Sequence, residues 1–188
     1  MELLSVLTAF GLSASAGLNA YIPLLIIACL GKFTDLIHLS QPWDALTSWW
    51  IIGVLSVLSI IEFFADKVPA VNHVNDLIQT FVRPTAGAVA FAASAQVVTD
   101  VHPVLSLGLG LLVAGGVHTV KAAAVRPMVT AATGGAGNIP VSILEDVVSG
   151  VVSILSIIVP VLIACILILV TSWAVYRLWV NSIKATEL

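Results

Sequence analysis

Apolar residues occur along the chain in five long segments, at 3–30, 46–64, 77–98, 104–125 and 147–175. Charged residues, prolines and glycines are concentrated between these segments. A membrane-spanning helix needs about 20 predominantly apolar residues, and each of the first four segments has room for one. The pattern therefore predicts an all-α fold, a polytopic bundle of transmembrane helices that forms a single domain over 1–188.

The last segment is longer than one span requires and contains Pro160 near its middle. It is either one long helix with a break or two spans hinged at Pro160. The apolar neighbours of Pro160 favour one broken helix. We therefore expect five to six spans.

The first segment is interrupted by small and polar residues around Asn19. A secretory signal is not expected, because the apolar run is preceded by Glu2 and by no lysine or arginine. Pro23 would free a backbone carbonyl one turn earlier, and unwound backbone at membrane depth lines protein or water rather than lipid. Asn19 and Tyr21 are therefore candidate ligands for an ion or substrate. The alternative is a kink in which Asn19 bonds to a neighbouring helix.

Composition supports the membrane interpretation. Hydrophobic residues make up 60% of the chain and charged residues 9%, and the mean hydropathy is +1.13. Soluble domains carry about 25% charged residues, so a soluble enzyme is excluded. A net charge of −3 gives no indication of a nucleic-acid partner. Trp49 and Trp50 open the second segment, as is typical of a membrane interface.

The basic residues predict the orientation. Lys67 and Arg83 lie in the loop expected at 66–83, which overlaps the start of the third segment, and Lys121 and Arg126 lie where the fourth segment ends, so these two loops hold four of the seven basic residues. Basic loops face the cytoplasm, which places the N-terminus there as well. The C-terminal tail contains Arg177 and Lys184, so the same rule favours a cytoplasmic C-terminus. This location requires the last segment to span twice, which gives six spans and conflicts with a single broken helix.

The chain also shows weak internal symmetry between the halves 1–100 and 101–188. The string AGLN at 16–19 has an echo in AGGVH at 114–118, and each is followed by a pair of acids. Three spans in each half would make the halves an inverted repeat with broken or re-entrant helices, an arrangement that builds binding sites in many transporters. The alternative is chance, because small residues are common in membrane helices.

Glu62, Asp66 and Lys67 end the second segment. Glu62 and Asp66 are four residues apart and share one helical face. A charge inside a membrane costs at least about 2.5 kcal/mol and persists where it finds a partner, so both acids are candidates for a cation or proton site. For Asp66 and Lys67 we favour the alternative, an interfacial cap in the headgroup layer.

Other polar residues are candidates on weaker grounds. His73 could join Asp66 and Asp76 in a metal site, although no metal-binding spacing supports one and the metal stays unknown. Asp76 fits better in the first turn of a helix that Asn72 or His73 caps, where the helix dipole favours an acid. His118 and Lys121 share one helical face and could pair with Glu62 or Glu145. A snorkelling Lys121 is the alternative.

The glycine-rich stretch at 130–138 predicts a hinge or re-entrant turn. It lacks the lysine of a phosphate-binding loop, and Pro140 follows it. We expect a capped helix to begin near Ser142, with Glu145 and Asp146 in its first turns, where the helix dipole favours acids.

Several strings resemble a known family. They are SAGLNAY at 15–21, EFFADKVP at 62–69, FVRP at 81–84 and GGAGNIP at 134–140, the last followed by EDV at 145–147. They resemble a bacterial multi-pass membrane family that is catalogued as a domain of unknown function. The resemblance covers nearly the whole chain and implies a bacterial inner-membrane location, but it implies no substrate, activity or cofactor.

Two functions remain open. The first is a small transporter or channel-like protein for a cation or a proton-coupled solute, which would bind at Asn19, Tyr21, Glu62, Asp66, His73, His118, Lys121, Glu145 and Asp146. A chain this short favours a homodimer. The second is a structural or lipid-binding protein in which Lys67, Arg83 and Arg126 hold anionic headgroups. Enzymatic activity is not expected, because no nucleophile–base pair or dinucleotide-binding motif is present.

Overall fold

A computed structural model of the chain describes residues 2–67, 69–95 and 102–159, with side chains described from residue 5 onward except at 69–74. All regular elements of the described residues are helices, which confirms the all-α prediction. In chain order they are α1 (Glu2–Leu18), α2 (Tyr21–Phe33), the 3₁₀ helix η1 (Trp43–Thr47), α3 (Trp49–Ala65), α4 (Pro69–Ala95), α5 (Pro103–Val120), the π-helical segment η2 (Lys121–Val125), α6 (Arg126–Thr133) and a further helix Asn138–Val159.

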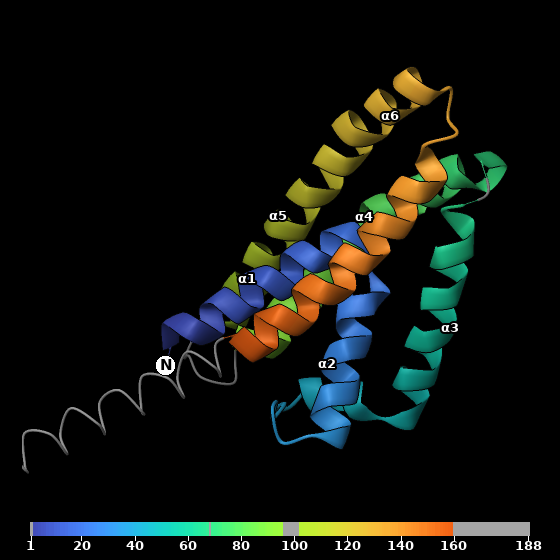
Figure 1. Ribbon diagram of the computed structural model, residues 1–188. Coiled ribbons are helices and arrows are strands. Elements are labelled where there is room, and N and C mark those ends of the chain that lie inside the picture. Colours follow the sequence, from blue (N-terminus) through green and yellow to red (C-terminus); the bar gives the residue numbers. More distant parts are fainter. Residues whose placement is uncertain (1, 68, 96–101, 160–188) are drawn as a thin grey trace, which may run out of the picture.

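The predicted interruption of the first segment is confirmed, and it lies between α1 and α2. The two helices diverge from their junction instead of continuing in one line (Figure 1). The Oδ1 of Asn19 accepts hydrogen bonds from the backbone N–H groups of Tyr21 (3.1 Å) and Ile22 (3.0 Å). These bonds satisfy two of the amides that a helix start leaves unpaired. Pro23 lies in the first turn of α2, where proline is tolerated.

The fourth segment continues further than predicted. α5, η2 and α6 form one long rod over Pro103–Thr133, so Lys121 and Arg126 lie within a helix and their placement in a loop was wrong (Figure 1). Pro127 cannot donate a backbone hydrogen bond. The rod accommodates this residue by a π turn, in which the Arg126 N–H donates to the Lys121 carbonyl, five residues back.

The predicted turn at 130–138 is confirmed for 134–137. Gly134 and Gly135 have φ angles of 61° and 93°, which side-chain-bearing residues rarely adopt. The chain reverses there, and the helix Asn138–Val159 returns beside α1 (Figure 1). It begins four residues before the predicted start at Ser142. α4 likewise begins at Pro69, before the predicted start of the third segment.

Small residues allow the central helices to approach closely. A Cβ atom at Gly17 of α1 would lie 2.6 Å from the Ala114 carbonyl of α5, and one at Gly110 would overlap the Gly87 carbonyl of α4. The two strings that suggested a repeat therefore contact each other. However, the string AGLN at 16–19 marks the end of a helix, whereas the string AGGVH at 114–118 lies inside one that continues beyond it. The described residues therefore do not support an inverted repeat.

Two of the described helices, Pro103–Thr133 and Asn138–Val159, are long and apolar enough to cross a membrane. The apolar helices 5–18, Tyr21–Phe33 and Trp49–Ala65 are shorter. Pro160, on which the choice between five and six spans depends, lies outside the described residues.

Candidate functional site: a buried network of ion pairs

Asp66, directly after α3, is the centre of a network of buried charges. Its side chain is 2% exposed, and Oδ2 lies 3.0 Å from Arg126 Nη2, 3.4 Å from Arg83 Nη2 and 3.6 Å from Lys121 Nζ. The other oxygen accepts a 2.6 Å hydrogen bond from Asn75. Asp66 is the C-cap residue of α3, as predicted, but it is also buried among three bases from α4, η2 and α6. Its position in the headgroup layer stays a prediction.

Glu62 lies one helical turn before Asp66 and is fully buried with Arg83. Its Oε1 accepts hydrogen bonds from Arg83 Nη2 (2.9 Å) and Nε (3.2 Å). Arg83 Nη1 lies 3.3 Å from Nδ1 of His118. Arginine can only donate, so His118 Nδ1 is an acceptor and the ring is neutral, with its Nε2–H directed to Thr80 Oγ1 at 3.2 Å.

Lys121 joins Asp66 to the second pair of acids. Its ammonium group lies 2.8 Å from Glu145 Oε2 and donates a 3.0 Å hydrogen bond to the Leu18 carbonyl at the end of α1. Arg126 is 3.7 Å from the same Glu145 oxygen. Glu62 and Glu145 are therefore not in direct contact. Arg83 connects Glu62 to Asp66, and Lys121 connects Asp66 to Glu145.

Asp146 extends the network toward α1 and the end of α3. It accepts a 2.9 Å hydrogen bond from Asn19 Nδ2 and forms a 3.1 Å ion pair with Lys67. Lys67 also donates to the Phe63 carbonyl and lies over the Phe63 ring. Asn19 thus contacts both Asp146 and the start of α2.

The two helix ends at the break face charges of the appropriate sign. The Leu18 carbonyl ends α1 and accepts from the Lys121 ammonium, whereas the Ala20 N–H precedes α2 and lies 3.2 Å from Glu62 Oε2. A helix has partial negative charge at its C-terminus and partial positive charge at its N-terminus. The network therefore stabilises the break electrostatically.

Most of the predicted site residues meet in this network: Asn19, Glu62, Asp66, His118, Lys121, Glu145 and Asp146. The side chain of Tyr21 instead lines an apolar pocket of about 330 Å³ beside α4. The side chain of His73 lies outside the described residues. Arg83 and Arg126, expected at lipid headgroups, are buried ion-pair partners.

Three contacts of the network were not predicted from the sequence: those of Asn75 and Ser142 with Asp66, and that of Asp76 with Arg126. Ser142 Oγ is 3.4 Å from Asp66 Oδ2, and Asp76 is 3.6 Å from Arg126. Asp76 lies in the helix 69–95, ten residues after Asp66. If the helix had been predicted to start at Pro69, Asp76 and Arg83 would have been expected two turns apart on one helical face. This spacing is the sequence feature that could have indicated Asp76 as a member of the network.

Among the described residues the network contains five carboxylates (Glu62, Asp66, Asp76, Glu145 and Asp146) and four bases (Lys67, Arg83, Lys121 and Arg126), and His118 is neutral. Each carboxylate has a base within 3.6 Å, and Asp76 is the most exposed of the five, with 23% of its side chain accessible. Among the described residues no cluster of three His, Cys, Asp or Glu side chains has the geometry to hold a metal ion.

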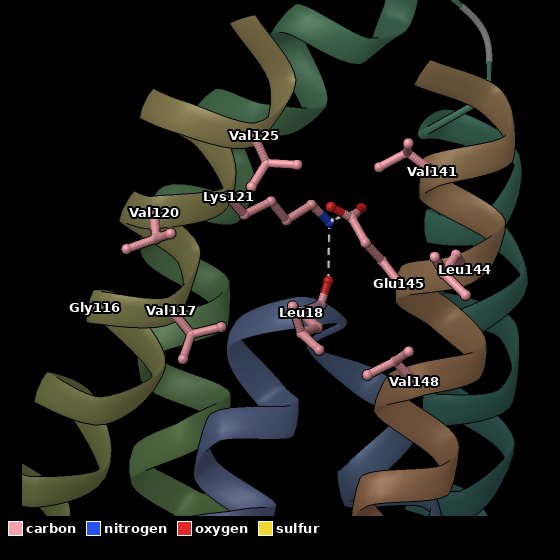
Figure 2. Close-up of a pocket in the computed structure, with 10 residues that line it drawn as sticks. All are labelled: Leu18, Gly116, Val117, Val120, Lys121, Val125, Val141, Leu144, Glu145 and Val148. Atoms are coloured by element: carbon pink, nitrogen blue, oxygen red, sulfur yellow. Dashed lines mark hydrogen bonds and ion pairs between the residues drawn. The ribbon is translucent and has the colours of Figure 1, made fainter. Parts of the chain in front are cut away.

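Two pockets adjoin the network and are lined by different members of it. A polar pocket of about 900 Å³ is lined by Asp66, Lys67, Asp76, Arg126 and the turn at 134–136. An apolar groove of about 500 Å³ runs between the rod Pro103–Thr133 and the helix Asn138–Val159 (Figure 2). The Lys121–Glu145 ion pair bridges the two helices there, with Val125 and Val141 on one side of it and Val117 and Val148 on the other (Figure 2).

Comparison with known proteins identifies one family. Residues 6–180 match the family model described as a domain of unknown function, DUF4126. No curated protein and no solved structure matches the chain.

Proposed function

The chain belongs to the DUF4126 family, and we propose that it is a polytopic protein of the bacterial inner membrane that moves a cation or a proton-coupled small solute through the buried network. The bundle would have five to six spans and would work as a homodimer. The observation that carries this proposal is the cluster of mostly buried acids and bases that meets at the break between α1 and α2 and borders a pocket of about 900 Å³.

The exposure of the long helices supports a membrane location. Only 22% of the most apolar window of Pro103–Thr133 and 33% of that of Asn138–Val159 are buried, whereas the core helix of a soluble protein is mostly covered. Exposed, contiguous apolar surface of this kind needs lipid or a partner. α3 has the same character, with Val54, Val57, Ile60 and Ile61 each more than half exposed.

Aromatic residues support the same location. Trp49 and Trp50 are 66% and 86% exposed at the start of α3, and Lys32 lies over the Trp49 ring, as expected of a membrane interface. α3 rises about 25 Å from there at 1.5 Å per residue. In a hydrocarbon core about 30 Å thick, this rise would place Asp66 toward the opposite face.

The acids beside the polar pocket support a role in cation or proton movement. Asp66 and Asp76 line this pocket together with Lys67 and Arg126. A proton or a monovalent cation that enters the pocket could therefore reach two carboxylates of the network. Broken helices whose ends point at a charged site are also a feature of secondary transporters.

The alternative, a lipid-binding protein, has less support. Arg83 is fully buried against Glu62 and could not reach a headgroup without breaking that ion pair. Lys67 and Arg126 line the polar pocket, but each has an acidic partner within 3.1 Å.

Flux through proteoliposomes tests the proposal. The protein would be reconstituted with a dye sensitive to H⁺, Na⁺ or K⁺ inside, and the response to an imposed gradient of each ion would be recorded. We expect a protein-dependent flux of at least one of these ions that falls more than tenfold in Glu62→Gln, because this change removes one carboxylate from the network. Asp35→Asn, an exposed acid outside the network, is the matched control and should retain the flux. Unchanged flux in Glu62→Gln, or none above empty liposomes in the wild type, would refute the proposal.

A further inference from the structure

The polar pocket beside Asp66 is lined by side chains whose oxygen atoms lack hydrogen-bond donors. Among the described residues, Oδ1 of Asp76 and Oδ1 of Asn138 are buried without a hydrogen-bond partner, and both residues line this pocket. Leaving a buried acceptor without a donor is unfavourable. Both atoms belong to terminal torsions that rotate over a broad range, so either side chain can turn this oxygen toward a donor in the pocket.

The π turn leaves a backbone oxygen of the same wall without its usual donor. In an α-helix the Ala122 carbonyl would accept from the Arg126 N–H, but that N–H donates to the Lys121 carbonyl instead. The next residue is Pro127, which has no N–H to donate. Ala122 and Pro127 both line the pocket, so a carbonyl without either helical donor belongs to its wall.

The charges around the pocket favour a cation over an anion. The nearest base to Asp76 among the described residues is Arg126 at 3.6 Å, whereas the other four acids of the network each have a base within 3.1 Å. The two bases of the wall, Lys67 and Arg126, each have an acid within 3.1 Å. The rod ends at the turn 134–136, which also lines the pocket, and a helix C-terminus carries partial negative charge. A cation would therefore gain a weakly paired carboxylate and a negative helix end, whereas an anion would have to displace an acid from its base.

The size and the lining of the pocket favour an organic cation over a metal ion. Its volume of about 900 Å³ lies within the range of small-molecule sites, about 300–1,000 Å³. In the described part of the chain, no group of three His, Cys, Asp or Glu side chains could hold a metal ion. The apolar side chains of Pro127, Ala131, Ala136 and Ile139 also line the pocket, and they would contact the hydrocarbon part of a ligand.

We propose that the polar pocket binds a small organic cation with a primary ammonium group. Such a group has three N–H donors, which match the three oxygens without donors at Asp76, Asn138 and Ala122. The charge would lie at Asp76, and the hydrocarbon part would lie against the apolar side chains. This inference rests on the proposed function and names the chemical class of its solute.

Equilibrium dialysis of the purified, detergent-solubilised protein tests the site with three probes of similar size, and protein-free micelles give the background. Benzylammonium has the charge and the N–H donors, benzyltrimethylammonium has the charge alone, and benzoate has the opposite charge. We expect benzylammonium to bind at least tenfold more tightly than either of the others. No binding of benzylammonium above background, equally tight or tighter binding of benzyltrimethylammonium, or a preference for benzoate would each overturn the inference.

Two variants test whether the cation is bound in this pocket. Asp76→Asn removes the carboxylate and should weaken benzylammonium binding more than tenfold, whereas Asp44→Asn, at an exposed acid of η1, should leave it unchanged. Ala131→Phe keeps every charge and fills the pocket from an exposed position of α6, so it should weaken binding by a similar factor. Gel filtration and a thermal melt would confirm that each variant is folded. Binding that either pocket variant leaves unchanged would place the cation elsewhere and overturn the inference.

The two proposals can fail separately. Benzylammonium binding that depends on Asp76, with no ion flux in liposomes, would leave the pocket site intact and refute transport. Ion flux that depends on Glu62, with no benzylammonium binding, would leave transport intact and refute the pocket site.

Discussion

The two acid-bearing segments of the network have different closest bases. Glu62 and Asp66 at the end of α3 have arginines as their nearest partners, Arg83 at 2.9 Å and Arg126 at 3.0 Å. Glu145 and Asp146 near the start of Asn138–Val159 have lysines, at 2.8 Å and 3.1 Å. The first pair of acids is at most 2% exposed by side chain and the second about 10%.

This difference indicates two roles within one network. Arginine stays charged and holds a fixed, planar arrangement of donors, whereas lysine is a flexible point charge that moves and titrates readily when buried. We therefore expect the Glu62–Arg83 pair to contribute more to the stability of the fold than the Glu145–Lys121 pair.

The largest effect is expected for Arg83→Met. The change leaves the buried Glu62 carboxylate without its base. Removing one partner of a buried ion pair lowers the free energy of unfolding by about 3–5 kcal/mol. The free energy of unfolding, measured by tryptophan fluorescence in SDS–detergent mixtures, should fall by that amount. The double variant Arg83→Met with Glu62→Leu should recover most of the loss. No recovery in the double variant would show that Arg83 acts through other contacts.

A smaller effect is expected for Lys121→Met. Glu145 then keeps Arg126 at 3.7 Å, and it also borders the groove. The loss of the ion pair and of the bond to the Leu18 carbonyl should cost about 2 kcal/mol. The same unfolding assay measures it, with Lys32→Met at the opposite end of α2 as a control. A loss equal to that of Arg83→Met would remove the expected difference between the two pairs.

Much of this comparison was accessible from the sequence, because charges are rare in the chain. Glu62, Lys121 and Glu145 were identifiable as candidates, since each is one of only a few charges next to long apolar stretches. The broken first helix was also predictable from the small and polar residues around Asn19. Hydropathy shows where a helix is interrupted, and it shows which charges need partners.

The partners themselves were not predictable. Arg83 and Arg126 were assigned to headgroups because basic residues between apolar segments usually lie in loops. In the structure α4 begins earlier and the rod Pro103–Thr133 continues past Pro127, so both arginines point into the bundle. The π turn that carries the helix past Pro127 has no signature in a single sequence, and the tertiary packing decides which charges meet.

The smallest effect is expected at Asn19, which bonds to the start of α2 and to Asp146. Its Oδ1 caps α2 beside Glu62, and its Nδ2 donates to Asp146. Asn19→Ala removes both, and the loss of a helix cap costs about 1 kcal/mol. Asn19→Ser keeps a capping oxygen but is too short to bond to Asp146, so it should cost less than Asn19→Ala. If serine recovers the full stability, the cap is what matters and the link to Asp146 contributes nothing. If serine is as destabilising as alanine, the bond to Asp146 is what holds the break in place. The segment with Glu145 and Asp146 would then contribute more to the stability of the fold than its greater exposure suggests.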